Sequence, residues 1–581
     1  MGSAQAMPRR RFLVTAGLPY SNGLLHVGHV AGAYLPADTW VRYLKARGDD
    51  VRFVCGSDDN GVASLLSARK EGRPVEELTA DYRARQAEDF KSLGIEFDVY
   101  GGTHQPGFVE RHVEISQSIF RRIADKGYFV KRASEQLYDP VARQFLPDRY
   151  VRGTCYHTKA DGTPCGYTEA YGDQCESCGN AIDPMRLVDP VSAISGVRPE
   201  PRTTTHWYLS LARFEEPLGR WLESKRTATP DSPAWREWIL NFTLGQIRGG
   251  LPERAMTRDL SWGVPVPLAD PDAAGKVLYV WFDAPIGYVS FTSVLCERET
   301  GDPAAYERWW KSPDTRIVHF IGEDNTVFHA LIWPAMLMAE GTYELPWQVV
   351  ANAFLNIRFP GREEEKISKS RGTAIWIAEY SKRFDPDPLR YYLTAIAPET
   401  NRTTFEIEDF AARNNGELLN ALGNFIHRTL TFVERNLDCR VSELGPLGEL
   451  DQEHVALIAA QHERVTECLE QFRFRQALAE VMALARAGNV YLDRKAPWKE
   501  RRTDPAACGT TLNVCLQTVR ALATCMAPFL PHSASRVAAM LGLDPRAPLP
   551  WHEAVLPLPA GHALGKPEVL FRKIEPDELG S

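Results

Sequence analysis

The stretch RRRFLVTAGLPYSNGLLHVGHVAGAYLPADTWVRYLKARGDDVRFVCGSD, residues 9–58, decides the fold class. Residues 9–17 predict a short buried strand that ends in Gly17, and residues 26–48 carry apolar side chains at helical spacing. Residues 49–58 predict a second buried strand. A strand, a helix and a strand within about 40 residues form a right-handed βαβ unit. The chain therefore opens as an α/β domain with a doubly wound parallel (Rossmann-like) sheet, whose ligand crevice lies at the carboxyl ends of the strands.

The character of the sequence changes several times after this unit. Residues 128–251 are rich in Gly, Asp, Cys and Pro, which predicts an insertion. The α/β pattern resumes in residues 276–289 and 315–324, predicted as strands, and in residues 326–339, predicted as a helix. After about Asp409, apolar residues at helical spacing predict an all-α bundle. These changes divide the chain into a first α/β half (1–127), an insertion (128–252), a second α/β half (253–345), a linking region (346–405), a helical domain (406–550) and a C-terminal tail (551–581).

Composition excludes several classes of protein. The chain has 581 residues, of which 44% are apolar and 24% are charged, so a soluble protein of three to four domains is expected. No apolar run reaches the roughly 18 residues of a membrane span, so no membrane partner is expected. The net charge is −8, and any nucleic acid must therefore bind local basic patches. The 11 cysteines are mostly scattered singly, which is typical of a reducing cytoplasm.

The tetrad His26-Val27-Gly28-His29 begins the first predicted helix, directly after a strand. Backbone N–H groups and the positive end of the helix dipole favour phosphate at this position. The two imidazoles can donate to phosphate oxygens, and Gly28 lets a flat base approach the backbone. A chance match or a packed pair of histidines is the alternative, but the place after a strand favours a nucleotide site.

A second basic motif, KISKSRG (366–372), follows an acidic run and precedes another helix. The flexible ammonium groups of Lys366 and Lys369, beside serine hydroxyls, suit a mobile clamp on a triphosphate. There they would stabilise charge that develops on the α-phosphate and on the departing pyrophosphate. A solvated charged loop is the alternative. The combination with HVGH, several hundred residues upstream, favours the clamp.

Together the two motifs resemble the HIGH and KMSKS signatures of the class I aminoacyl-tRNA synthetases. Other stretches resemble the methionyl-tRNA synthetase family: GLPYSNGLLHVGH (17–29), GSDDNG (56–61), LYDPVARQFLPDRYVRGTC (137–155), YVWFDAPIGY (279–288), HFIGED (319–324) and KAPW (495–498). The resemblance runs from about Phe12 to at least Trp498. It implies a methionine–tRNA ligase, which activates L-methionine with ATP to methionyl-adenylate and transfers it to the 3′ end of tRNA(Met). The implied catalytic residues are His26, His29, Lys366 and Lys369.

The resemblance also implies where both small substrates bind. The residues expected to contact ATP are His26, Gly28, His29, Gly322, Asp324 and Lys369. Those expected to contact methionine are Gly17, Leu18, Tyr20, Asp58, Trp281, Ala284, Pro285, Tyr288 and His329. Asp58 matches the family's aspartate for the substrate ammonium, and aromatic rings suit a polarizable thioether. Taken singly, Trp281 and Tyr288 would be ordinary core residues. The chain departs from the family at Glu323, where a lysine is usual, and at Asp59 and Asn60, where the common D-E-H-G reads D-D-N-G.

Cys155, Cys165, Cys175 and Cys178 have the spacing C-x9-C-x9-C-x2-C on Gly-rich turns. Four thiolates make a tetrahedral structural zinc site, and the last pair has knuckle spacing. The family's usual first pair is C-x2-C, so YHTKADGTP is an apparent insertion. There are two alternatives. His157 could replace one cysteine as a ligand, or the segment could be a metal-free loop with free thiols. Zinc is favoured because a short polar segment lacks another core.

Asn424 and Arg428 lie four residues apart on one predicted helix face, and Pro497 and Trp498 are predicted in a loop between helices. An exposed indole can stack on an unpaired base while Asn and Arg read its edge. The resemblance implies that these four residues read the CAU anticodon, and that residues 346–405 contact the tRNA stem. For Trp498 alone, packing between helices is the default. The basic residues around it form a local patch: Arg494, Lys495, Lys499, Arg501 and Arg502.

The implied enzyme is a cytoplasmic monomer that uses Mg²⁺ with ATP and holds a structural Zn²⁺. Two other functions stay open. One is a paralogue that activates another amino acid or delivers aminoacyl-tRNA to secondary metabolism, suggested by the altered DDNG, GED and cysteine spacing. The other is a non-catalytic tRNA-binding protein, against which the intact HVGH and KISKS argue.

Overall fold

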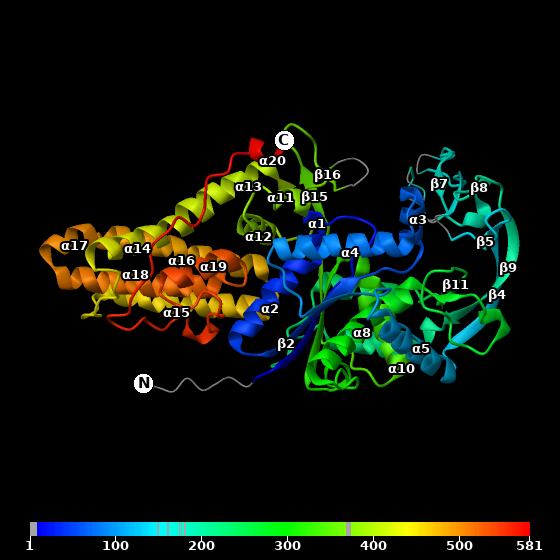
Figure 1. The fold of residues 1–581 in the computed structure, drawn as a ribbon, viewed down its shortest axis with the longest axis horizontal. Coiled ribbons are helices and arrows are strands. Elements are labelled where there is room, and N and C mark those ends of the chain that lie inside the picture. Colours follow the sequence, from blue (N-terminus) through cyan, green and yellow to red (C-terminus); the bar gives the residue numbers. More distant parts are fainter. Residues whose placement is uncertain are drawn as a thin grey trace.

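The computed structural model describes residues 9–580 except 148–149, 160–161, 173–174, 176, 179, 181 and 368–372. A parallel five-stranded sheet in the order β14-β13-β1-β2-β3 forms its centre (Figure 1). The strands are β1 (Arg11–Ala16), β2 (Asp50–Ser57), β3 (Val99–Gly102), β13 (Thr315–Gly322) and β14 (Gln348–Asn352). β1 pairs in parallel with both β2 and β13, which places the first βαβ unit at the middle of the sheet. The doubly wound α/β fold predicted from the opening stretch is confirmed.

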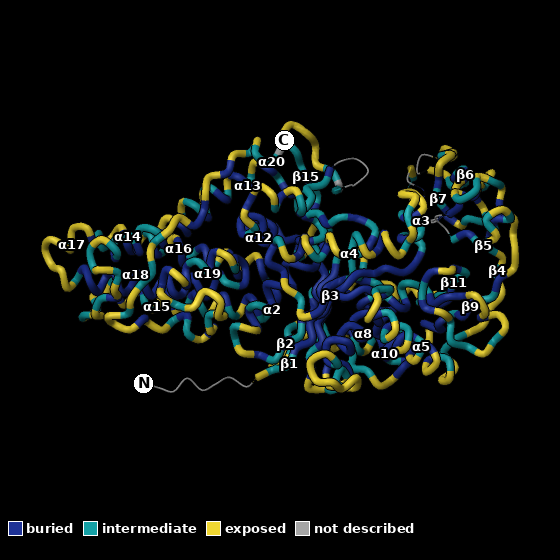
Figure 2. The backbone as a smooth tube through the Cα atoms, in the orientation of Figure 1, coloured by how far each residue is buried: buried dark blue, intermediate teal, exposed yellow. Residues whose placement is uncertain are grey.

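Helices cover both faces of this sheet, because successive side chains of a strand point to opposite faces. Phe12 and Val14 belong to a core shared with α2 (Leu35–Arg47) and α4 (Val75–Ser92). Leu13, between them, belongs to a second core. That core is shared with α5 (Val109–Asp125), α8 (Val280–Thr300) and α10 (Trp333–Glu340). The central strands are accordingly buried along most of their length (Figure 2). Burial on both faces explains the near-continuous apolar runs in their sequences.

One predicted strand is a helix. Residues 276–289 contain a two-residue strand, β12 (Val277–Leu278), and then the start of α8, so the prediction of a strand there was wrong. Nearly every residue of α8 from Phe282 to Cys296 is buried. Such a helix has no polar face, and apolar periodicity cannot distinguish it from a buried strand. The other two predictions are confirmed: β13 occupies the second stretch, and the π-helical segment η7 (Phe328–Ile332) with α10 occupies the third.

The insertion forms separate sheets beside the α/β core (Figure 1, right). Its main sheet has the order β10-β9-β4-β5, with β4 (Phe129–Asp139) and β9 (Glu200–Leu209) as the long antiparallel pair. A smaller sheet has the order β7-β6-β8. The short strands are β5 (Gln144–Phe145), β6 (Val151–Thr154), β7 (Ala170–Tyr171), β8 (Val188–Ser192) and β10 (Arg254–Ala255). None of these strands pairs with the central sheet in the described residues.

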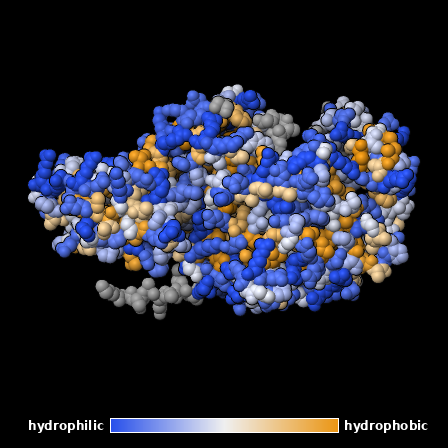
Figure 3. Space-filling model, in the orientation of Figure 1, coloured by the Kyte–Doolittle hydropathy of each residue, from blue (hydrophilic) through white to orange (hydrophobic). Residues whose placement is uncertain are grey.

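A small sheet, β16-β15-β17, comes between the α/β core and the helices in chain order. Its strands are β15 (Leu355–Arg358), β16 (Glu365–Lys366) and β17 (Thr403–Glu406). The helices that follow are α13 (Ile407–Arg413), the π-helical η8 (Asn414–Gly423), α14 (Asn424–Asn436), α15 (Glu449–Glu470), α16 (Phe474–Lys495), α17 (Pro497–Thr503), α18 (Pro505–Met526) and α19 (Pro531–Met540). The visible face of this region carries many hydrophilic side chains (Figure 3). No helix in the described part of the chain has the length and apolar character needed to cross a membrane.

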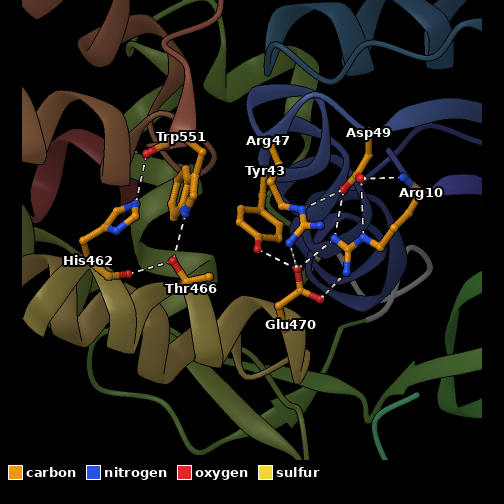
Figure 4. Close-up of polar contacts among 8 residues, drawn as sticks. All are labelled: Arg10, Tyr43, Arg47, Asp49, His462, Thr466, Glu470 and Trp551. Carbon is orange, nitrogen blue, oxygen red and sulfur yellow. Dashed lines mark hydrogen bonds and ion pairs between the residues drawn. The ribbon is translucent and has the colours of Figure 1, made fainter. Parts of the chain in front are cut away.

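A polar cluster joins the bundle to the first βαβ unit (Figure 4). Glu470, at the end of α15, accepts hydrogen bonds from Arg10 at 2.8 Å, from Tyr43 at 2.6 Å and from Arg47 at 3.5 Å. Trp551 packs edge-on against Tyr43 with ring centroids 4.9 Å apart. These contacts anchor the helical region directly to α2 and to the start of β1.

The C-terminal segment returns from the bundle toward the small sheet (red in Figure 1). The Asn415 side chain donates to the carbonyl of Ile574 at 2.8 Å and accepts from its N–H at 3.0 Å. The C-terminal segment therefore stabilises the first turn of η8.

Candidate functional site

Three central strands end at one cavity with a volume of about 390 Å³. Gly17 follows β1, Asp58 follows β2 and Gly322 ends β13, and all three line the cavity, as expected for a crevice at strand carboxyl ends. The other predicted residues that line it are Leu18, Tyr20, His26, Gly28, His29, Trp281, Ala284, Pro285, Tyr288, Asp324 and His329. The fold thus brings together every residue predicted to contact ATP or methionine apart from Lys369, which lies outside the described residues.

The two histidines open a short helix at the cavity wall. His26 is the N-cap of α1 (Val27–His29), and its Nδ1 accepts from the N–H of Gly28 at 3.2 Å. The Nδ1 of His29 accepts from the N–H of His26 at 3.2 Å, and the two rings stack with centroids 3.7 Å apart. A Cβ on Gly28 would lie 3.1 Å from both the His26 ring and Ile367. Because each Nδ1 accepts a backbone hydrogen, each neutral ring carries its proton on Nε2, the tautomer that can donate to a phosphate.

The loop that carries KISKS begins and ends beside this helix. Before the loop, β16 ends at Lys366 and the next residue, Ile367, lines the cavity. After the loop, the carbonyl of Ile375 accepts from the N–H of Val27 at 3.1 Å. Lys369 itself falls in residues 368–372, outside the part of the chain that the structure describes. The HVGH helix and the two ends of the loop that carries KISKS, far apart in the sequence, therefore meet at one cavity.

Aromatic rings form one wall of the cavity. Trp281 stacks on Phe328 with centroids 4.0 Å apart, and it meets Tyr20 edge-on at 6.4 Å. The Nδ1 of His329 lies 3.1 Å from a main-chain carbonyl, which can only accept, so Nδ1 carries the proton. Its Nε2 therefore accepts from the Tyr288 hydroxyl at 2.9 Å. Burial lowers the pKa of His329 to about 4, so this wall carries no positive charge near pH 7 and suits a thioether.

Asp58 places a buried carboxyl at the same cavity. The residue is 5% exposed, and its Oδ1 has no hydrogen-bond partner among the described residues. Burial, with the nearby carboxyls of Asp283 and Asp59, raises the pKa of Asp58 well above its ordinary value. An opposite charge would favour the carboxylate and reverse that shift. The site is therefore suited to a cation such as an ammonium group.

Two of the departures from the family pattern, Glu323 and Asn60, have partners of their own. The Oε2 of Glu323 accepts from the N–H of Phe354 at 3.1 Å, and its Oε1 pairs with Arg402 at 2.8 Å. Asn60 is buried and donates to Asp283 at 2.6 Å. Glu323 is thus directed toward the exposed guanidinium group of Arg402. Asn60 is part of a buried polar network that includes Asp283.

The four clustered cysteines approach one another closely. The sulfurs of Cys155 and Cys178 lie 3.8 Å apart, those of Cys165 and Cys175 lie 3.7 Å apart, and all four lie within 4.8 Å of one another. Zn–S bonds of about 2.3 Å in a tetrahedron separate the sulfurs by about 3.8 Å, so the cluster fits a zinc ion. The main-chain carbonyl of His157 accepts from the N–H of Cys165 at 2.8 Å. The geometry favours a four-cysteine set over one that includes His157.

Two of the predicted anticodon residues, Pro497 and Trp498, belong to α17, which lies at the outer end of the helical region (Figure 1, left). The guanidinium carbon of Arg428 is 5.7 Å from the ring centroid of Trp498, which is 41% exposed. Asn424 is also exposed and begins α14, one turn before Arg428. Pro497 and Trp498 open helix α17, so their prediction as a loop was wrong. Proline suits the first helical position because the N–H it lacks would have no partner within the helix.

Comparison with known proteins identifies the family. The family model described as "tRNA synthetases class I (M)" matches residues 12–430, and the one described as "Anticodon binding domain of methionyl tRNA ligase" matches residues 441–581. The chain belongs to the methionyl-tRNA synthetase family. A methionine–tRNA ligase of Salinibacter ruber is 44% identical over 98% of this chain and 80% of its own length. A methionine–tRNA ligase of Pyrococcus abyssi is 43% identical over 98% of this chain and 76% of its own length.

A solved structure of this family is similar over nearly the whole chain. It is the crystal structure of Mycobacterium tuberculosis methionyl-tRNA synthetase bound by methionyl-adenylate. Its TM-score is 0.77 at 26% identity, covering 97% of this chain and 100% of that one. The activity of the chain is that of a methionine–tRNA ligase, a class I aminoacyl-tRNA synthetase.

Several residues that line the cavity were not singled out from the sequence, among them Phe328 and Gln86. Phe328 stacks on Trp281, but in the sequence it is one apolar residue in a buried helical run. Gln86 lies in the middle of α4, remote from every motif. No local pattern marks these positions, because only the packing of α4 and η7 brings them to the cavity.

Proposed function

We propose that this cavity is where methionine and ATP react. The methionine carboxylate attacks the α-phosphorus in line, giving methionyl-adenylate and pyrophosphate, and the methionyl group then passes to the terminal ribose hydroxyl of tRNA(Met). The observation that carries the proposal is the meeting of the HVGH helix, the ends of the KISKS loop and Asp58 at one cavity. The similar structure from M. tuberculosis, which is bound by methionyl-adenylate, supports the same use.

ATP binds on the HVGH side. The positive end of the helix that begins at Val27, together with the Nε2–H groups of His26 and His29, attracts its phosphates. Gly28 leaves room for the flat base, and Gly322 and Asp324 receive the ribose. Glu323, held by Arg402, does not place its carboxylate against the polyphosphate. Mg²⁺ accompanies ATP and is held largely by phosphate oxygens and water.

Methionine binds on the aromatic side. The Asp58 carboxylate pairs with its ammonium group, and Trp281, Tyr20 and Tyr288 surround its thioether. Selectivity then comes from shape, in a wall that the neutral His329 leaves uncharged. The remaining contacts are Gly17, Leu18, Ala284 and Pro285.

Zinc is held by the sulfurs of Cys155, Cys165, Cys175 and Cys178. Four thiolate ligands complete a closed tetrahedral set, so the ion is structural and takes no part in the reaction. It orders a segment whose own apolar core is small and includes two of the four cysteines.

Asn424, Arg428, Pro497 and Trp498 read the anticodon. Residues 346–405 contact the tRNA stem, and the six segments inferred from the sequence are the proposed domains. The juxtaposition of Arg428 and the exposed Trp498 supports this reading. A cytoplasmic location and a monomeric state complete the proposal.

Methionine-dependent ATP–pyrophosphate exchange by the purified chain tests the reaction. Lys369, assisted by Lys366, stabilises the transition-state charge, so Lys369→Ala should lower the exchange rate by about 10²-fold. Lys70→Ala, at an exposed lysine of α3 (Val62–Glu71), is the matched control and should leave it unchanged. An unchanged rate in Lys369→Ala would refute the role of the KISKS loop. Exchange with a different amino acid in place of methionine would instead establish the paralogue.

A further inference from the structure

The loop between β1 and α1, residues 17–25, links the two proposed substrate sites. Tyr20 lies on the methionine side, and His26, which directly follows the loop, lies on the ATP side. Part of the loop is held by a strand end, since the N–H of Asp58 donates to the carbonyl of Pro19 at 2.9 Å. Carbonyls farther along the loop need other partners, because buried main-chain groups are rarely left unpaired.

Gln86 supplies two of these partners. It lies on α4, is 1% exposed and lines the cavity. Its Nε2 donates to the carbonyls of Tyr20 and Gly23, both at 2.9 Å. Its Oε1 accepts from the Tyr100 hydroxyl at 3.1 Å. Both N–H donors of the amide are used on the loop, and because the two carbonyls can only accept, they fix the orientation of the amide and leave its oxygen to Tyr100.

A second residue of α4 holds the same loop one turn later. The carboxyl of Asp89 accepts from the N–H of Leu25 at 3.4 Å. Gln86 and Asp89 are three residues apart and therefore share a helix face. This face of α4 thus contacts the loop from Tyr20 to Leu25, the residue directly before His26.

We propose that Gln86 is a positioning residue for adenylate formation. By holding the carbonyls of Tyr20 and Gly23, it sets the methionine wall at a defined distance from the phosphate site at His26. This inference rests on the function proposed for the cavity. In-line attack needs reacting atoms about 3–3.5 Å apart, and a displacement of about 1 Å can cost about 10²-fold in rate. An amide is required because a carboxylate or an alkyl side chain offers no donor to either carbonyl.

Exchange kinetics of the full-length chain, normalised to active sites titrated by the adenylate burst, test the proposal. In Gln86→Leu and Gln86→Glu, kcat should fall about 10- to 100-fold. The KM of each substrate should change less than about fivefold, because the groups that bind the ground states remain. Tyr100→Phe keeps both loop bonds and should cost less than about threefold. Gln517→Leu, at a glutamine of α18 that is 6% exposed and remote from the cavity, is the matched control and should behave as wild type.

Amide hydrogen exchange provides a readout that does not depend on activity. Residues 20–25 should exchange faster in Gln86→Leu than in the wild type or in Gln517→Leu. Unchanged loop exchange, or a kcat per active site within twofold of wild type in both Gln86 variants, would overturn the inference. If the wild-type chain showed no methionine-dependent exchange, the proposed function would fall and this inference with it. If the wild type were active and both Gln86 variants had the same kcat, the role of Gln86 would be wrong while the proposed function would stand.

Discussion

The role that we propose for Asp58, selection of a positively charged substrate group, rests on its own surroundings. Its carboxyl is buried beside two other carboxyls, which raises its pKa, and its Oδ1 has no partner in the described structure. An ammonium group supplies both the charge and the hydrogen bond that this oxygen lacks.

We expect Asp58→Asn to raise the KM for methionine about 100-fold in the exchange assay. The reason is the loss of a hydrogen bond between charged groups, which contributes about 1.5–3 kcal/mol. The KM for ATP should change little and serves as the internal control. An equal rise in both KM values would show that the variant damages the cavity as a whole.

His329 makes stability depend on pH. Its pKa is about 4 in the folded protein because of burial, against about 6.5 in the unfolded chain. Between these values the unfolded chain binds more protons, so stability falls as the pH drops from about 6.5 to 4. From pH 7 to pH 5 this single group should cost about 2 kcal/mol.

The melting temperature of wild type should therefore fall more between pH 7 and pH 5 than that of His329→Gln. His454 has a similarly lowered pKa, about 4, and remains in both proteins, so the difference isolates His329. Identical pH dependence in the two proteins would contradict a neutral, buried His329.

At the scale of elements, the four-cysteine segment is where the chain relies most on a ligand. The small sheet β7-β6-β8 packs on an apolar core of few residues, among them Cys155 and Cys175. We expect the purified chain to contain about one zinc per molecule, because four thiolates at tetrahedral spacing form a closed structural site.

Removal of zinc by a chelator should make residues 150–187 more susceptible to proteolysis while the bundle melts as before. Cys178→Ser should reproduce this effect, and Cys439→Ser, at a half-buried cysteine outside the cluster, should not. A full zinc content in Cys178→Ser would contradict the four-cysteine set.

At the scale of the whole molecule, the two proposed recognition sites lie far apart. The cavity lies at the central sheet, and α17, which carries Trp498, lies at the far end of the bundle (Figure 1). Between them, Glu470 binds Arg10, Tyr43 and Arg47 and anchors the bundle to α2 (Figure 4). The reaction with ATP can therefore proceed without contact at the anticodon end.

We expect Trp498→Ala to raise the KM for tRNA in aminoacylation about 10- to 100-fold, because stacking on a base contributes about 1–3 kcal/mol. ATP–pyrophosphate exchange should stay unchanged, since it requires no tRNA. Phe242→Ala, at an aromatic of α7 (Glu237–Arg248) that is as exposed but lies outside the bundle, is the control. A loss of exchange in Trp498→Ala would mean that the residue supports the fold.

The amino-acid sequence by itself determined the α/β class, the insertion and the helical bundle. Apart from Lys369, which lies outside the described residues, each residue that it predicted to contact ATP or methionine lines the cavity. These features depend on local information: apolar runs bounded by glycine, helical periodicity, and the motifs HVGH and KISKS. The prediction of a strand at the start of α8 was wrong, because burial of this helix on all sides removes the helical periodicity. The prediction of a loop at Trp498 was wrong because α17 is a short helix.

Tertiary structure alone decided what meets at the cavity. Gln86 reaches the loop after β1 because α4 packs across it, and Phe328 reaches Trp281 because η7 packs against α8. Glu323 is turned toward Arg402, a residue 79 positions away. Each of these contacts depends on the separation of two elements in space, and no pattern within either element encodes that separation.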